Sequence, residues 1–184
     1  MNVKNIVFAV GFSALMLSGA ETAAPVENLV KDGDFSLKQS SPRAFGKWWL
    51  GGAISENRKA SYDTKDFKSA PQSVCIESEG ETIALRQSLP DLKPNTKYKI
   101  TFFMKLENVE LKGKFGGARL NIYGDRNHWC PAKFLTGTLP WTQYEAEFTS
   151  GPDTNGKNKS YMLLYLMNAS GKVWFDDIQL AEVK

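Results

Sequence analysis

The sequence predicts an all-β sandwich, and three observations lead to that class. Short stretches of alternating apolar and polar residues recur along the chain, and Gly, Pro, Asn and Asp separate them. No run of helical periodicity follows residue 20. The clearest stretch is 171–180, G-K-V-W-F-D-D-I-Q-L, which is rich in β-favouring residues. Short strands at this spacing are typical of two packed antiparallel sheets.

The expected strands, in chain order, are 28–30, 47–50, 60–62, 73–78, 82–89, 97–106, 116–123, 141–149, 160–168 and 171–180. The polar segment 53–69 is expected to be mostly loop, with 60–62 as a short strand inside it. Internal repeats and long linkers are absent from the sequence. We therefore expect a single domain over 21–184, a length that suits one sizeable core.

Residues 1–20 have the pattern of a cleavable export signal. Lys4 supplies the positive charge, 6–17 form an apolar core, and Ser18-Gly19-Ala20 is a small-residue cleavage site. The apolar core is too short for a membrane span. Leu17 to Ala20 resembles a lipobox with Ala20 in place of the lipidated cysteine. The expected location is therefore secreted or periplasmic, without membrane insertion.

Charge and histidine content exclude several classes of function. Removal of the signal takes away Lys4 and no acid, so the formal net charge falls from +3 to +2. Such a balance does not favour nucleic acid or an anionic membrane as a partner. His128 is the only histidine, and no G-x-S-x-G surrounds a serine, so the sequence does not support a nucleophilic triad.

The two cysteines, Cys75 and Cys130, leave two alternatives open. In an oxidising compartment they can form a disulfide, which would stabilise the fold by about 4 kcal/mol in the chain-entropy model. The other alternative is two unrelated thiols, one on a strand and one in a loop.

Strand parity separates core residues from candidates for binding. In 97–105 the apolar face must be core, which leaves Phe103 as an aromatic residue among polar neighbours on the other face. In 117–123 the outward residues are Arg119, Asn121 and Tyr123. A fork of donors, an amide and an aromatic ring suit sugar rings, which have polar edges and apolar C–H faces.

Three further aromatic positions are candidates for the same surface. The strand 160–168 is apolar on both faces, so Tyr165 lies either under a loop or on the floor of a groove. Trp129 lies in 124–131, G-D-R-N-H-W-C-P, directly after the strand that holds Tyr123. Of Trp48 and Trp49, one must point inward and one outward. The alternative for all of these residues is an ordinary sheet surface with scattered aromatics.

Three motifs resemble carbohydrate-binding modules of the family 4/9 type. They are N-L-V-K-D-G-D-F at 28–35, L-K-P-N-T-K-Y-K-I-T-F-F-M-K at 92–105, and V-W-F-D-D-I-Q-L at 173–180. The resemblance covers most of the chain after the signal and implies a galactose-binding-like β-sandwich of jelly-roll type. It also implies non-catalytic binding of a polysaccharide, β-glucan or xylan-like, in a groove on one sheet. The implied partners are the polysaccharide and a separate glycoside hydrolase or cell-surface complex.

The same resemblance implies a structural calcium ion that pins the N-terminal segment to the last strand. Asp176 matches the family's carboxylate in the last strand, and Asp34 lies in the matching N-terminal turn. Ser36 replaces the acidic residue that often follows in the family. From the residues alone, Asp176 and Asp177 can instead accept backbone N–H donors or face water at a strand bulge.

Two other classes of function stay open beside the binding module. A polysaccharide lyase could use Tyr123, His128 and Arg119, and a hydrolase could use Glu145 and Glu147, which lie about 6.6 Å apart at strand rise. The second class is a protein-interaction or adhesion domain with a degenerate sugar site.

Overall fold

The computed structural model describes residues 27–52, 54–124, 127–129, 133–152 and 160–184. The predicted export signal, 1–20, lies outside the described residues. All regular structure in the described part is β-strand. It contains no helix long and apolar enough to cross a membrane.

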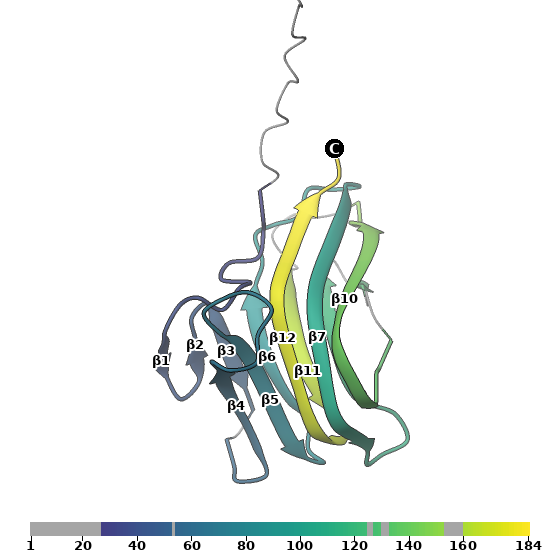
Figure 1. Ribbon diagram of the computed structural model, residues 1–184. Helices are drawn as coiled ribbons and strands as arrows, with labels where there is room; N and C mark the ends of the chain where they lie inside the picture. Colours follow the sequence, from purple (N-terminus) through teal and green to yellow (C-terminus); the bar gives the residue numbers. More distant parts are fainter. Residues whose placement is uncertain (1–26, 53, 125–126, 130–132, 153–159) are drawn as a thin grey trace, which may run out of the picture.

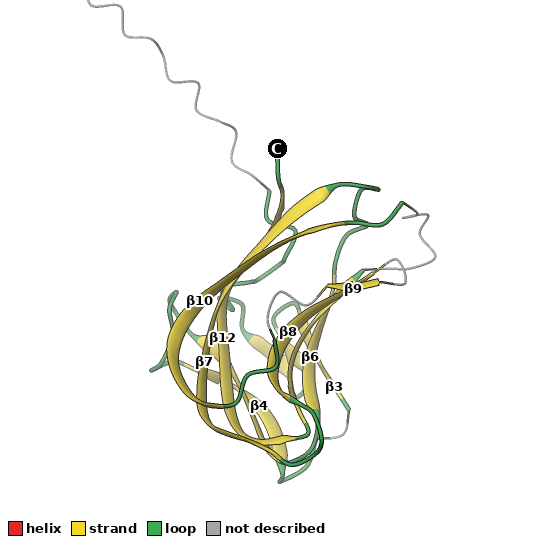
Figure 2. Ribbon diagram, turned by 90° about the vertical axis from the view of Figure 1, so that its right-hand side faces the viewer, coloured by secondary structure: helices red, strands yellow, loops and turns green. Residues whose placement is uncertain are grey.

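The strands form two sheets in which every neighbouring pair is antiparallel (Figure 1). The seven-stranded sheet has the order β1 (Gln39–Ser41), β2 (Ala44–Phe45), β3 (Trp48–Gly51), β6 (Ile83–Ser88), β11 (Tyr161–Met167), β8 (Gly117–Gly124) and β9 (Asn127–Trp129). The five-stranded sheet has the order β10 (Gly137–Thr149), β7 (Lys97–Leu111), β12 (Ala169–Glu182), β5 (Ser73–Glu79) and β4 (Arg58–Asp63). Figure 2 shows the two sheets packed against each other. The predicted all-β jelly-roll sandwich is confirmed.

The core lies between the sheets and follows the predicted parity. Along β7, the side chains of Tyr98, Ile100, Phe102 and Met104 are at most 2% exposed. On β3, Trp48 is buried and Trp49 is 54% exposed, as the period of two requires. The residues that alternate with these core residues point away from the core and form two outer faces, one on each sheet.

The segment 28–30, predicted as a strand, is not one, but it lies along β12. Leu29 N–H donates to the Leu180 carbonyl at 2.7 Å. The Asn28 amide donates to the Ile178 carbonyl at 3.1 Å and accepts from Leu180 N–H at 2.9 Å. A Cβ at Gly33 would lie 2.1 Å from the Ile178 carbonyl oxygen, so only glycine fits this approach. The side chain of Asn28 thus replaces part of a strand ladder.

Strand boundaries differ from the prediction where long-range pairing extends or creates a strand. The predicted short strand 60–62 is part of the longer β4, which pairs with β5 over its whole length. The short strands β1, β2 and β9 were not expected, because their sequences are too short to show alternation.

Candidate functional site

Register places the outward residues of four neighbouring strands on the outer face of the seven-stranded sheet. One row across β3, β6, β11 and β8 consists of Trp49, Arg86, Leu163 and Asn121. The rows on either side pair Tyr161 with Tyr123 and Tyr165 with Arg119. We call this surface, together with the adjoining Phe134 and Phe115, the aromatic face.

A stacked tyrosine pair forms one end of the aromatic face. The rings of Tyr123 and Tyr161 lie 5.0 Å apart at 14°, and both side chains are partly exposed. The guanidinium of Arg86 lies over the Tyr161 ring at 4.1 Å from its centre. Tyr161 on β11 therefore lies between the Arg86 guanidinium on β6 and the Tyr123 ring on β8, so this end of the face combines stacked aromatic rings with N–H donors, the two kinds of group that suit a sugar ring.

Arg119 is fixed against two other rings. Its guanidinium lies 3.9 Å from the centre of the Phe134 ring, and its Nε donates to the Tyr165 hydroxyl at 3.0 Å. A second nitrogen of the same guanidinium also donates to this hydroxyl. Burial raises the pKa of Tyr165 to about 12, although the hydrogen bond from Arg119 opposes the shift. Tyr165 is therefore neutral at physiological pH, and Arg119 keeps its charge in a fixed orientation.

The structure brings together part of the predicted binding set. Arg119 and Tyr123 lie partly exposed on the aromatic face. Asn121 and Tyr165 share that face by register but are at most 1% exposed, so they support neighbouring side chains and offer little surface to a ligand. Register sets Trp129 opposite Ile122 and His128 opposite Tyr123, but the side chains of β9 are outside the described part.

Phe103 was predicted for the binding set and lies on the other sheet. It belongs to β7, where Lys68 covers its ring at 5.0 Å. The structure therefore does not bring Phe103 together with the other candidates, because parity tells which residues point out of a sheet but not which sheet they belong to.

Sequence reasoning did not assign Arg86, Tyr161, Phe134 and Phe115 to the site. Alternation in 83–88 places Arg86 outward, so its side of the strand was readable. Its position beside Tyr161 follows from the pairing of β6 with β11, which the sequence does not specify. Phe134 and Phe115, with ring centres 6.5 Å apart, reach the face from outside the regular strands.

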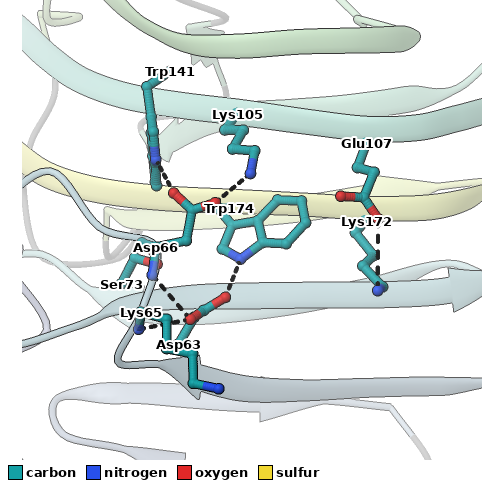
Figure 3. A network of polar contacts seen from close by, with 9 residues as sticks. All are labelled: Asp63, Lys65, Asp66, Ser73, Lys105, Glu107, Trp141, Lys172 and Trp174. Carbon is teal, nitrogen blue, oxygen red and sulfur yellow. Dashed lines mark hydrogen bonds and ion pairs between the residues drawn. The ribbon is translucent and has the colours of Figure 1, made fainter.

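A satisfied polar network covers part of the outer face of the five-stranded sheet (Figure 3). The Trp174 indole donates to Asp63 at 2.9 Å, and the Trp141 indole donates to Asp66 at 2.5 Å. Lys105 pairs with Asp66 and lies over the Trp174 ring at 4.5 Å. Burial would raise the pKa of Asp63, but hydrogen bonds from Lys65, Trp174 and Asp66 outweigh it and lower the pKa. Since each partner is engaged, this network is structural.

Asp176 does not fit the role of a calcium ligand. Its carboxylate is fully buried and accepts from Lys68 N–H at 2.6 Å, from Ser69 N–H and Oγ at 2.8 Å each, and from Asp177 N–H at 2.8 Å. A carboxylate offers about four lone-pair positions, and these donors occupy them. Burial raises the pKa of Asp176, and the same hydrogen bonds oppose that shift.

Asp34 shows no metal geometry either. Its carboxylate accepts from Ser36 N–H at 3.3 Å within the turn. In the described part of the chain, no three His, Cys, Asp or Glu side chains gather around a possible ion. Hydrogen bonds of the Asn28 side chain and of the backbone at Leu29 and Gly33 link the N-terminal segment to β12.

Cys75 is a free thiol in the structure. It lies on β5 between Val74 and Ile76, which point into the core, so its side chain faces outward on the five-stranded sheet. Burial raises its pKa to about 12. Cys130 lies outside the described residues, so the two alternatives for this pair, a disulfide or two unrelated thiols, both stay open.

A cavity of about 360 Å³ lies away from the aromatic face. Its lining includes Leu29, Tyr98 and the ion pair between Lys93 and Glu182 at 2.5 Å. The polar groups in that pair already bind each other, so we do not place the site there.

No protein-family model and no curated protein matches this chain. Among solved structures, the xylan-binding domain CBM22-1 of Xyn10C from Paenibacillus barcinonensis matches with a TM-score of 0.60 and 16% identity, over 88% of this chain and 98% of that one. TmCBM61, solved with β-1,4-galactotriose, matches with a TM-score of 0.54 and 16% identity, over 85% and 99%. This chain has the fold of the carbohydrate-binding β-sandwiches.

The same fold is found within a larger protein. The enzymatically active domain of tailspike protein 4 from bacteriophage CBA120 matches with a TM-score of 0.58 and 11% identity. The match covers 85% of this chain but 21% of the tailspike chain. The β-sandwich is thus confirmed as a fold, whereas the assignment to the galactose-binding-like group and to family 4/9 stays a prediction.

Proposed function

We propose that this chain is a non-catalytic module that binds a polysaccharide on its aromatic face. The observation that carries the proposal is the stacked Tyr123–Tyr161 pair, with ring centres 5.0 Å apart, beside the fixed guanidinium of Arg119. Flat aromatic surface and planar donors are what sugar rings require. The solved modules of similar fold support it, since one is described as xylan-binding and another holds a galactose trisaccharide.

Several finer properties belong to the same proposal. Family 4/9 membership and a β-glucan or xylan-like main chain follow from the sequence resemblance. Export to the cell exterior follows from the N-terminal pattern at 1–20. The sequence has no triad motif, which is consistent with a module that acts beside a separate glycoside hydrolase or in a cell-surface complex. The proposal does not include a structural calcium ion that has Asp176 as a ligand.

The test is affinity electrophoresis through gels that contain xylan, mixed-linkage glucan, β-1,3-glucan, mannan or alginate, with Tyr161→Ala beside the parent. Loss of a central aromatic anchor typically makes the free energy of binding less favourable by about 2 kcal/mol or more. The affinity of Tyr161→Ala, measured from its retardation, should therefore be at least about 30-fold lower than that of the parent. Circular dichroism melts check that the variant remains folded.

Each polymer is also assayed for new reducing and unsaturated ends. Retardation without product supports the proposal. New unsaturated ends would contradict it and favour a lyase, for which the pairing of His128 with Tyr123 across β9 and β8 would be the starting point. Absence of retardation on every polymer would favour the interaction-domain alternative.

A further inference from the structure

Arg86 is an exposed cation at the centre of the aromatic face. It lies opposite Trp49 on β3 and opposite Leu163 on β11. Its guanidinium stacks on Tyr161, and no carboxylate within the described part of the chain forms an ion pair with it. The stacked contact fixes the plane of the guanidinium and leaves its edge donors to solvent.

Arg119 is the second cation on this face and is also without a carboxylate partner in the described residues. Its contacts are the Phe134 ring and the hydroxyl of Tyr165. Because Tyr165 has a pKa of about 12, it adds no negative charge to the face. Both arginines therefore keep an uncompensated positive charge among the described groups.

The opposite sheet shows the contrast. On its outer face, Lys97 pairs with Glu147 at 2.5 Å and Lys99 pairs with Glu145 at 2.9 Å. These lysines are matched by acids across the β7–β10 ladder. Lys68, which lies over Phe103 on the same sheet, has no ion pair among the described residues, so unmatched cations are not confined to the aromatic face. The contrast is that acids accompany cations on the outer face of the five-stranded sheet, whereas none of the residues named for the aromatic face is acidic.

We propose that the aromatic face recognises an anionic polysaccharide, one whose sugars carry carboxylate or sulfate groups, with Arg86 and Arg119 as the residues that select it. The inference rests on the proposed sugar-binding function. Planar guanidinium groups bind such oxyanions with two parallel hydrogen bonds, whereas neutral hydroxyls need no net charge. Sugar rings would pack against the exposed parts of the Tyr123–Tyr161 pair while the acid groups reach the arginine edges.

The spacing of the two arginines favours a polymer over a single acidic sugar. They are anchored on β6 and β8, with β11 between them, and are offset by two residues along the strands, so their backbones lie about 12 Å apart. Each guanidinium is held against a different ring, Tyr161 or Phe134. Two separate acid groups on one chain can therefore be bound at once.

The test is the affinity of the purified protein for a set of galactan polymers with one backbone and different charge. The set consists of polygalacturonate, the neutral galactan obtained by reducing its carboxyl groups and the sulfated galactan made from that neutral form, with alginate as a second uronate and neutral xylan and mixed-linkage glucan beside them. The variants are Arg86→Gln and Arg119→Gln. Lys97→Gln is the matched control, because it removes the same charge from the opposite sheet. Thermal melts accompany all three, and Arg86→Gln decides alone if Arg119→Gln does not fold.

The expected result is about tenfold or greater preference for a charged polymer over its neutral form, lost in both arginine variants and kept in Lys97→Gln. Raising salt from about 0.15 M to about 1 M shortens the Debye length from about 8 to 3 Å, so binding of the charged polymer should weaken several-fold while neutral binding does not. Preference for polygalacturonate or alginate would identify uronates, and preference for sulfated galactan would identify sulfate.

Equal binding of neutral xylan or glucan, unchanged by either arginine variant, would overturn this inference and leave the proposed function intact. An equal loss in Lys97→Gln would also overturn it, because the attraction would then be that of general surface charge. Binding to no polymer would overturn the proposed function itself.

Discussion

A buried residue of the aromatic face can contribute to binding by holding a neighbouring side chain in place. Tyr165 is 1% exposed, yet its hydroxyl holds two nitrogens of Arg119 in place. Arg119 in turn covers Phe134. Because this guanidinium is ordered before any ligand arrives, binding does not need to order it again. Tyr165 is therefore a positioning residue, although parity alone would offer it as a contact.

Cys75 leads to a prediction about thiol chemistry. With its pKa raised to about 12 by burial, and 7% of its surface exposed, it is a thiol rather than a thiolate at about pH 8. Peptide mapping after treatment with a maleimide should find Cys75 unmodified in the native protein and modified after denaturation without reductant. A Cys75 that stays unmodified in both states until reductant is added would instead establish the disulfide with Cys130.

The last strand organises the fold at the level of elements. Its register shifts between Asp176 and Gln179, and Asp177 takes a φ of 48° at this bulge. The bulge lets Ile178 N–H donate to the Gly33 carbonyl at 2.9 Å. On the outer side, Asp176 holds the backbone of Lys68 and Ser69. One irregularity thus anchors two loops that are far apart in sequence.

Asp176→Asn is expected to destabilise the protein by about 2–3 kcal/mol, measured by urea unfolding. An amide nitrogen in place of Oδ2 cannot accept from the Lys68 and Ser69 N–H groups, and in place of Oδ1 it cannot accept from Ser69 Oγ and Asp177 N–H, so two buried donors lose their acceptor in either orientation. The matched control is Asp177→Asn, which makes the same charge change at a carboxylate that accepts from the Gln179 side chain near the surface. It is expected to cost less than about 0.5 kcal/mol.

A chelator separates this explanation from a metal site. Because protein donors occupy the Asp176 carboxylate, the loss in Asp176→Asn should be equal with and without chelator. A loss that disappears when chelator is present would mean that a bound cation, and not the Lys68–Ser69 loop, is what Asp176 stabilises.

In the whole molecule, the outer faces of the two sheets lie on opposite sides of the sandwich (Figure 2). One face carries stacked aromatics and unmatched arginines, and the other carries the tryptophan–aspartate network and paired lysines. This separation means that a ligand on one face does not contact the other.

Phe103→Ala is therefore expected to leave glycan affinity unchanged within about twofold, because Phe103 lies on the five-stranded sheet under Lys68. The variant is run in the same affinity gels as Tyr161→Ala. A loss as large as that of Tyr161→Ala would place the binding surface on the five-stranded sheet.

Most strands of the fold could be predicted, because alternation is a local property. The buried side of β7 and the pair Trp48/Trp49 follow from the period of two alone. The short strands β1 and β2 could not be predicted, since each exists through pairing with a neighbour and is too short to show a pattern. The sequence predicted a strand at 28–30 near the last strand, but it could not show that the Asn28 side chain makes hydrogen bonds to β12.

The sequence by itself determined the class of fold, the inward and outward residues of each strand, and the pair Arg119 and Tyr123 as neighbours on one face. Only the tertiary structure decided that Arg86 and Tyr161 join them, that Phe103 does not, and that Asp176 binds protein donors. The physical reason is that side-chain direction is set by the backbone of one strand. The assignment of strands to sheets and their register depend on contacts between residues far apart in the chain.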